Sequence, residues 1–413
     1  MATDNHVPRG DAAGPPSPII TGRGIYVPDD VLTNGDVAAV ADPRRLAAWV
    51  AANKWCQSRI AAGSEGTAPA LGECRRNRLL FEEYIGERVG IESRRVVDRG
   101  AILERQPSRR ALFGSDLGAQ AARAALDDAG LEAGEIDLVI CGTSTPDCIY
   151  PSTAIEIQDR LGARSACAFD VLAACSSFVF ALETARALIL AGCYRRALVV
   201  AAEYFSCGVD YGDPFNSFFW GDAAAAAVVE AAELGRAKGG YEVLATRCRS
   251  QLSHNILTGL GGTRPFLEAS ANGHCAQPAP GGPGYRYFYQ NGPRVYREVI
   301  PLVDGEIRGL LVENDLAVEQ VRLFMLHQAS MQMIEGIKKR LFHAEPEPGR
   351  VPVNLRTYGN TSSCGVAICL AEEAVMQPGD VACMAAFGGG YTVGTALIRK
   401  VGARPREIAR REP

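Results

Sequence analysis

Hydrophobic and polar positions along the chain switch between the two spacings that mark strands and helices. Pro18 to Tyr26 has the composition of an opening strand that ends at a Val-Pro pair. Asp116 to Gly130 carries apolar residues at helical spacing and ends at a glycine, as helices commonly do. Ile136 to Gly142 follows as a short, continuously apolar strand. This alternation of strand and helix predicts an α/β protein.

Three segments fall outside that alternation. Residues 40–82 carry helical spacing around Leu46 to Ile60, then a Gly- and Ser-rich break, then a basic stretch, so we interpret them as an inserted helical cap. Residues 1–18 are rich in Pro, Gly, Asp and Asn without an apolar stretch, which predicts a disordered leader rather than a signal peptide. Residues 402–413 are interpreted as a tail.

A weak internal repeat runs through the chain at a constant offset. LDDAGLEAGEIDLVICG resembles LVENDLAVEQVRLFMLH, which brings Ile136 onto Val321, 185 residues later (321 − 136). The same offset brings Cys175 onto Asn360 (360 − 175), and RALVVAAE resembles DVACMAAF. Matches in one register predict two copies of a βαβ-rich unit. The two units are predicted over residues 19–232 and 233–401.

Composition narrows the functional classes. A formal net charge of −4 and a pI near 5.9 argue against nucleic acid as the main partner. The chain has no apolar run of the length that a membrane-spanning helix needs, about 20 residues, so no membrane span is expected. The 13 cysteines include no CxxC pair. They predict reduced thiols in a cytoplasmic protein rather than a disulfide framework or a metal site.

One cysteine occupies a position suited to chemistry. In AFDVLAACSSFVFAL a short strand runs through small residues to Cys175, and a long apolar helix follows. A cysteine just before a helix is expected to have a lowered pKa, because the helix dipole and the free N–H groups favour the thiolate. The alternative for Cys175 alone is a buried, inert thiol, since free cysteines are mostly buried.

Two residues of the second half change that balance. His327 closes the apolar strand LFMLH and precedes a small-residue turn, which is the position of a catalytic group rather than of a core histidine. Asn360 lies in YGNTSS, ahead of an apolar helix. Asn360 alone could be a helix cap. Its match to Cys175 in the repeat favours a shared site, in which two equivalent helix starts face each other.

Four segments together resemble the motif set of the β-ketoacyl-acyl-carrier-protein synthase III family: DVLAACSSFVFAL, LHQAS, YGNTSS and FGGGYTVGTALIRK. The resemblance extends over roughly residues 19–400. It implies a thiolase fold, with two pseudo-symmetric αβ halves in a five-layered αβαβα arrangement, usually as a homodimer. It also implies that Cys175 is the nucleophile and that His327 and Asn360 handle the malonyl carboxylate and the resulting enolate.

The implied reaction has two stages. An acyl group is loaded on Cys175, and a malonyl-type thioester then loses CO2 and attacks it, giving a β-ketoacyl thioester in fatty-acid or specialised polyketide-type biosynthesis. The oxyanion would lie between the N–H groups of Cys175 and, by the family match, Gly389. No cofactor is implied. The substrates would be thioesters of coenzyme A or of carrier-protein phosphopantetheine, so acyl-CoA and acyl carrier protein are the expected partners.

The resemblance also marks substrate-binding candidates. EEYIGERVGI resembles the stretch that holds the nucleotide end of coenzyme A, with Tyr84 in place of a common stacking tryptophan and Arg88 at the basic position. Further candidates are Tyr150, Phe205 and Phe215 in the tunnel wall, and Ser330 in place of the Asn of the family's HQAN motif. These departures and the longer cap look closer to members that take medium-chain primers or serve specialised metabolism.

A basic cluster is the candidate docking surface for an acidic carrier protein. The cluster consists of Arg297, Lys338, Lys339 and Arg340. Ordinary solvated helix charge is the alternative interpretation of these residues.

Two other functions compete with condensation. One is a related acyltransferase that moves the acyl group from Cys175 to an alcohol or amine. The other is a non-catalytic partner subunit that shapes the pocket of another synthase. Retention of both His327 and Asn360 favours condensation over plain acyl transfer, and retention of Cys175 argues against the non-catalytic subunit.

Overall fold

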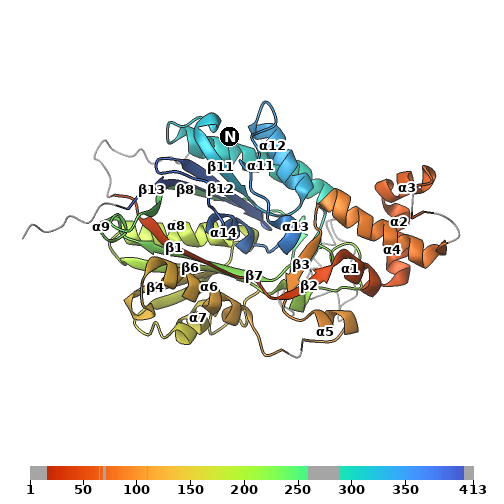
Figure 1. Ribbon diagram of the computed structural model, residues 1–413, viewed down its shortest axis with the longest axis horizontal. Helices are drawn as coiled ribbons and strands as arrows, with labels where there is room; N and C mark the ends of the chain where they lie inside the picture. Colours follow the sequence, from red (N-terminus) through yellow and green to blue (C-terminus); the bar gives the residue numbers. More distant parts are fainter. Residues whose placement is uncertain (1–15, 65, 68–70, 109, 259–287, 404–413) are drawn as a thin grey trace, which may run out of the picture.

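The computed structural model describes residues 16–64, 66–67, 71–108, 110–258 and 288–403. The predicted leader and tail lie almost entirely outside these residues. Within them the chain forms five layers, in which helices and sheets alternate (Figure 1). This is the αβαβα thiolase arrangement that the sequence predicted.

The first sheet layer belongs to the N-terminal half. Its strand order is β1-β7-β6-β4-β5, with β4 parallel to both β5 and β6 and the other neighbours antiparallel. These strands are β1 (Ile19–Tyr26), β4 (Leu138–Gly142), β5 (Cys167–Val171), β6 (Arg196–Glu203) and β7 (Ala223–Glu230). Every residue of β7 is buried. Both faces of this sheet are therefore covered, as expected for a sheet between helical layers.

The second sheet layer belongs to the C-terminal half and has the strand order β11-β12-β13-β8. These strands are β8 (Gly240–Ser250), β11 (Val321–Leu326), β12 (Val381–Gly388) and β13 (Thr392–Val401). The two sheets join at one corner, where Ile19 and Ile20 of β1 pair with Glu242 and Tyr241 of β8. The first half ends its sheet at Glu230, and the second begins its own at Gly240.

Helices fill the three remaining layers (Figure 1). The outer layers are α6 (Gly114–Ala129) with α7 (Thr153–Leu161), and α11 (Gly292–Val312) with α12 (Met331–Leu341). The central layer is α8 (Ser177–Leu190) with α14 (Cys364–Ala371). Residues Cys364 to Leu370 of α14 are all buried, because a sheet lies on each side of this layer. Helix α14, which follows the turn of Asn360, therefore lies at the centre of the molecule.

Shorter elements connect these layers. The remaining helices are α1 (Asn34–Val40), α5 (Arg99–Glu104), α9 (Ala232–Gly235) and α13 (Leu355–Tyr358), with single helical turns at Ile85–Val89, Ala133–Glu135, Ala174–Ser176, Phe205–Gly208 and Val318–Gln320. Two small strand pairs are β2 (Asp30–Thr33) with β3 (Ser93–Val96), and β9 (Ile256–Leu257) with β10 (Tyr289–Gln290).

The internal repeat has a direct structural counterpart. Strand β6 spans 196–203 and β12 spans 381–388, so both ends are 185 residues apart (381 − 196 and 388 − 203). Each is followed by an antiparallel neighbour, β7 or β13, and flanked by a parallel one, β4 or β11. The offset that was visible in the sequence therefore relates equivalent strands of the two halves.

The segment interpreted as a cap is helical. It contains α2 (Pro43–Ala52), α3 (Lys54–Ala61) and α4 (Glu73–Tyr84), which project from one end of the molecule (Figure 1). An aromatic cluster attaches them, with the ring of Trp49 4.9 Å from that of Phe81 and Phe81 5.7 Å from Phe218. The cap is thus fixed to the body by edge-to-face ring contacts.

Strand β1 lies unusually close to helix α6 because it contains glycines. A Cβ built on Gly24 would lie 2.2 Å from the carbonyl oxygen of Ala121 and 2.4 Å from the amide nitrogen of Ala125. Both atoms belong to the helix backbone, which cannot yield without moving the whole element.

We therefore expect Gly24→Ala to lower the free energy of unfolding by about 2 kcal/mol or more, because overpacking against a backbone forces the layers apart. Urea unfolding followed by circular dichroism measures this. Gly134→Ala is the matched control, since a Cβ there would meet no heavy atom of the described residues within 4 Å. Its effect should stay within about 0.5 kcal/mol. Equal stability of the two variants would contradict the close approach.

Candidate active site

Cys175 lies in the elbow between β5 and α8. Ala174 holds the left-handed conformation (φ 49°), which is uncommon outside glycine and turns the chain sharply just before the cysteine. The Ser177 hydroxyl braces the elbow, because it accepts a hydrogen bond from the Ala173 amide (2.8 Å) and donates one to the Ala174 carbonyl (2.7 Å). These contacts set the sulfur at the entrance to α8, where the sequence predicted it.

The end of strand β12 closes over this elbow. A Cβ on Gly388 would lie 2.5 Å from the Cys175 amide nitrogen and 2.7 Å from the Ala174 Cβ. Only glycine permits this approach. Gly389, the predicted second oxyanion donor, follows directly, so the glycine-rich end of the second half meets the cysteine of the first.

Asn360 also follows a residue with a positive φ. Gly359, 185 residues after Ala174 (359 − 174), has a φ of 70° with a ψ of −164°, a backbone conformation that glycine adopts without a steric penalty. The Asn360 backbone is anchored by hydrogen bonds from its N–H to the Phe219 carbonyl (2.7 Å) and from the Gly221 N–H to its own carbonyl (3.1 Å). Asn360 does not cap α14, because that helix has Ser363 at its N-cap. The helix-capping alternative is therefore set aside.

The Asn360 carboxamide is oriented by its own turn. The Ser362 amide donates a hydrogen bond to Asn360 Oδ1 (2.9 Å). The side-chain oxygen is thus occupied, and the NH2 group is directed away from that bond as a donor.

Ser362 connects the two halves of the site directly. Its hydroxyl lies 3.3 Å from the Cys175 sulfur and donates a hydrogen bond to it. Ser362 is itself left-handed (φ 51°), and such strained residues cluster at functional sites. This serine lies in the YGNTSS segment, and its sequence position predicted no role for it. Only the fold could reveal it, because the residues are 187 positions apart.

His327 lies at the end of β11, beside β12. Its backbone N–H donates to the Ala385 carbonyl (2.8 Å), and its ring meets the edge of the Phe387 ring, centroid to centroid 4.7 Å. Phe387 precedes Gly388, so the imidazole belongs to the strand ends that close over Cys175. The side chain is 2% exposed, and its Nδ1 has no hydrogen-bond partner in the described part of the chain.

Burial controls the charge of both groups. It lowers the pKa of His327 to about 3, so the imidazole is neutral at neutral pH. Part of Cys175 faces solvent, yet enough protein surrounds the thiol for burial to raise its pKa to about 12. The Ser362 hydrogen bond opposes that rise and the charge of Glu203 adds to it. The prediction of a lowered cysteine pKa was therefore wrong, because desolvation outweighs the helix start.

The tunnel-wall candidates separate into two groups. Phe205 is buried and stacks on Trp220, with ring centroids 4.1 Å apart and planes 9° apart. Trp220 in turn pairs with Asn360 through a backbone bridge, which puts this aromatic pair next to the site. Tyr150 and Phe215 are 85% and 51% exposed, so neither is enclosed by the described residues.

The remaining substrate-binding candidates, Tyr84, Arg88 and Ser330, also differ in their surroundings. Tyr84 packs its ring against Trp49 and Trp55, at 4.9 and 5.7 Å, within the cap cluster. Arg88 is exposed on the helical turn that follows α4. Ser330 is the N-cap of α12, where its hydroxyl accepts from the Met333 amide (3.3 Å). The structure thus gives Tyr84 and Ser330 packing and capping contacts of their own.

The predicted basic cluster is partly neutralised. Lys338 forms ion pairs with Glu335 (2.9 Å) and Glu345 (2.6 Å), and Arg340 lies 3.4 Å from Asp304. Arg297 and Lys339 are exposed. The positive charge at this surface is therefore weaker than the sequence suggested.

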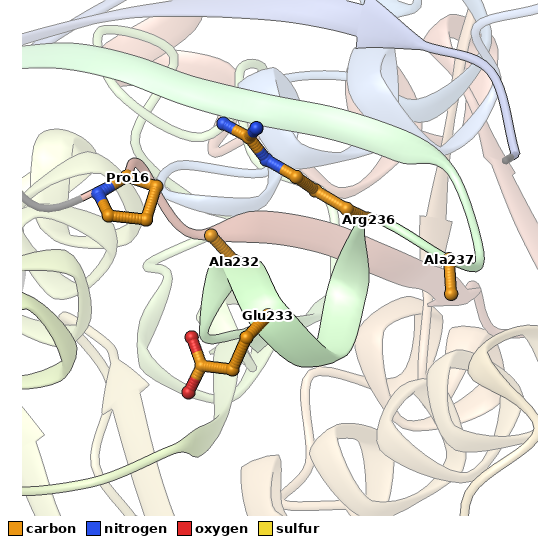
Figure 2. Close-up of a pocket in the computed structure, with 5 residues that line it drawn as sticks. All are labelled: Pro16, Ala232, Glu233, Arg236 and Ala237. Carbon is orange, nitrogen blue, oxygen red and sulfur yellow. The ribbon is translucent and has the colours of Figure 1, made fainter.

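A surface pocket lies away from these residues (Figure 2). It is lined by Pro16, Ala232, Glu233, Arg236 and Ala237. All of the lining residues except Pro16 follow β7, whose other end adjoins Asn360, so a strand of roughly 25 Å separates the pocket from the site. Among the described residues there is no cluster of ligands for a metal ion, no disulfide and no helix long and apolar enough to cross a membrane.

Two αβ halves around a buried helical layer, with an elbow cysteine at their junction, define a condensing enzyme of the thiolase class. Family models described as 3-oxoacyl-[acyl-carrier-protein] synthase III and its C-terminal domain match residues 169–251 and 311–400. The β-ketoacyl-[acyl-carrier-protein] synthase III of Caldanaerobacter subterraneus is 30% identical over 383 residues, which cover 92% of this chain and 97% of the relative. The chain therefore belongs to the 3-oxoacyl-[acyl-carrier-protein] synthase III family.

Solved structures agree with this assignment. The Aquifex aeolicus 3-oxoacyl-[acyl-carrier-protein] synthase III superposes with a TM-score of 0.69 at 28% identity, over 92% of this chain and 99% of that one. The priming β-ketosynthase of the R1128 polyketide pathway gives 0.69 at 25% identity, over 96% and 100%.

We expect the His327 imidazole to remain neutral between pH 5 and pH 8. Its folded pKa of about 3 lies below the ordinary value of 6.5, so the ring takes up a proton only at strongly acidic pH. Nitrogen-15 NMR of labelled protein, with the resonance assigned by loss in His327→Gln, measures this. A titration midpoint near 6.5 would show that the ring is not desolvated.

Proposed function

We propose that this enzyme loads an acyl group on Cys175 and condenses it with a malonyl-type thioester, with His327 and Asn360 stabilising the enolate. The observation that carries the proposal is the hydrogen bond from Ser362 to the Cys175 sulfur, combined with the bond from the Ser362 amide to Asn360 Oδ1. A single residue thereby ties the nucleophile of one half to the carboxamide of the other.

In the first stage the Cys175 sulfur attacks the carbonyl carbon of an acyl thioester. The carbon–sulfur bond of the donor breaks, and the departing thiol leaves with the proton that the cysteine loses. A thiol with a pKa near 12 is almost fully protonated at neutral pH, so attack requires a proton acceptor. The departing thiolate of the donor is the final acceptor of that proton, because burial makes the His327 imidazole, with a pKa of about 3, a weak base.

In the second stage the malonyl group loses CO2. The electron pair of the broken carbon–carbon bond moves into the thioester, and negative charge collects on its oxygen. The neutral imidazole of His327 and the NH2 group of Asn360 can each donate a hydrogen bond to that oxygen, worth about 3 kcal/mol per donor. A neutral His327 suits this role, because it forms no ion pair with the malonyl carboxylate before CO2 is lost.

The carbanion then attacks the acyl-cysteine. The tetrahedral oxyanion would receive hydrogen bonds from the N–H groups of Cys175 and Gly389, which the approach of Gly388 brings together. Collapse of this intermediate breaks the carbon–sulfur bond, releases the β-ketoacyl thioester and leaves a Cys175 thiolate, which takes up one proton from solvent to return to the thiol. The bonds balance without a cofactor.

The thioester donors are proposed to be acyl-CoA, an acyl carrier protein, or both. Arg88 is exposed next to the cap, and Arg297 on α11 and Lys339 on α12 are exposed as well. These residues could contact the phosphates of coenzyme A or the acidic surface of a carrier protein. The twelve cysteines that the structure describes are free, which supports a cytoplasmic place of action.

We expect the three site variants to separate the two stages. Cys175→Ala should abolish the acyl adduct seen by intact mass. His327→Ala and Asn360→Ala should keep some loading but lose CO2 release from a malonyl thioester by about 100-fold or more, because each removes an enolate donor.

Labelled CO2 and adduct mass are measured in parallel with medium-chain and short-chain acyl donors. Product on a hydroxyl or amine acceptor without CO2 release would replace condensation by plain acyl transfer. Normal decarboxylation by Asn360→Ala would remove Asn360 from the mechanism.

A homodimer is proposed from an unpaired sheet edge. Strand β5 pairs with β4 on one side and ends the sheet on the other, within the residues that the structure describes. Exposed apolar residues flank that edge, with Ile149 71%, Tyr150 85% and Leu172 75% exposed. An exposed edge beside apolar side chains favours pairing with an identical edge. A second copy would then bring Tyr150 toward its neighbour, which is how this residue could serve as a tunnel wall.

We expect sedimentation velocity to show a dimer at micromolar concentration and Leu172→Arg to shift it to monomer, because the new charge would be buried beside the edge strand. Val375→Arg, at an equally apolar position 52% exposed on the C-terminal half, serves as the matched control and should leave the dimer intact. A monomeric wild-type protein would overturn the dimer.

A further inference from the structure

A buried carboxyl group with no part in the proposed reaction lies behind the site. Glu203 ends strand β6 and is 0% exposed. On the side of the N-terminal half it accepts hydrogen bonds from the Thr145 hydroxyl (2.8 Å) and the Ser144 amide (3.1 Å), both in the loop after β4. On the side of the C-terminal half it accepts one from the Ser363 hydroxyl (2.7 Å).

Glu203 differs from the other buried glutamates of the chain. Glu230, Glu242 and Glu306 each form ion pairs with arginines, and Glu373 forms one with Lys400. No ion pair with a lysine, arginine or histidine is found for Glu203 within the described ranges. Burial raises the pKa of Glu203, and the hydrogen bonds from Ser363 and Thr145 oppose that rise. A buried carboxyl group without a cation is costly to fold around, so its hydrogen bonds are its main compensation.

Those hydrogen bonds span the two halves at one point. Ser363 follows Ser362, whose hydroxyl lies on the Cys175 sulfur and whose amide holds Asn360. The Ser363 hydroxyl also lies 3.1 Å from the carbonyl oxygen of Gly142 at the end of β4. The turn that carries the carboxamide is therefore fastened to the strand ends of the opposite half through Ser363.

We propose that Glu203 is a positioning residue for the condensing site, holding the 360–363 turn against the first half so that Asn360 and Ser362 keep their places relative to Cys175. This inference rests on the proposed function. Its physical basis is that enolate stabilisation requires donors placed within a fraction of an ångström, and a small displacement of the turn lowers the rate without abolishing binding.

The chemistry predicts different outcomes for two substitutions. Glu203→Ala removes the hydrogen bonds that Glu203 accepts from the turn. Glu203→Gln can still accept from Thr145, and its NH2 group can donate to the Ser363 oxygen while the Ser363 hydroxyl turns to the Gly142 carbonyl. The conservative variant thus keeps the connection between the halves.

Steady-state decarboxylation of a malonyl thioester by the full-length acyl-enzyme tests the proposal. Glu203→Ala should lower kcat by about 10- to 100-fold, with KM for the malonyl thioester changed less than about threefold. Glu203→Gln should restore kcat to within about threefold of wild type. Ser363→Ala removes the hydroxyl contacts to Glu203 and Gly142 and should fold even if Glu203→Ala does not, and it is expected to lower kcat about tenfold.

Glu230→Ala is the matched control. Glu230 is equally buried, but it lies at the far end of β7 and pairs with Arg196. This variant should be less stable than wild type but should keep the wild-type kcat per folded molecule. Titration of Cys175 with an alkylating reagent measures the folded fraction. A wild-type kcat in both Glu203→Ala and Ser363→Ala overturns the inference, and so does a loss in Glu203→Gln as large as that in Glu203→Ala. Absence of CO2 release from wild-type enzyme instead denies the proposed function.

Discussion

The close approach of strand β12 to the cysteine elbow is the contact on which the site depends. The amide of Cys175 occupies the space that a side chain at Gly388 would need. This contact is possible because α8 and α14 share one thin layer between the two sheets, so that strand ends of one half reach the helix starts of the other. Close packing of this kind converts a repeat in the sequence into one joint site.

Much of the architecture follows from local patterns. The apolar strand before Gly142 and the helix ending at Gly130 were predicted close to their observed bounds, because both combine strong periodicity with a clear end signal. The 185-residue offset predicted the equivalence of β6 and β12, since two copies of one unit keep the spacing of their buried strands. The same offset pointed to Cys175 and Asn360, whose preceding residues both have a positive φ.

Other properties depend on contacts that no local pattern contains. The helix start at Cys175 suggested a lowered pKa, but the protein packed around the thiol from the second half reverses the direction. Lys338 looked like part of a basic surface, yet two glutamates in its own neighbourhood pair with it. Ser362 and Glu203 acquire their roles only when distant segments meet. Desolvation and ion pairing depend on all the groups that surround a residue in the fold. The sequence therefore identifies candidate residues but not the direction in which their pKa shifts.

The all-buried strand β7, AAAAAVVE, carries a consequence for how this scaffold can change over time. Its alternate side chains face two different cores, and most are single methyl groups. Enlarging any one of them would press on an outer helix layer or on the central one, because the strand is buried on both faces. Divergence in substrate use would then be directed away from this strand, toward the projecting cap and the loops around the elbow, where new shapes can arise without disturbing the stacking of the layers.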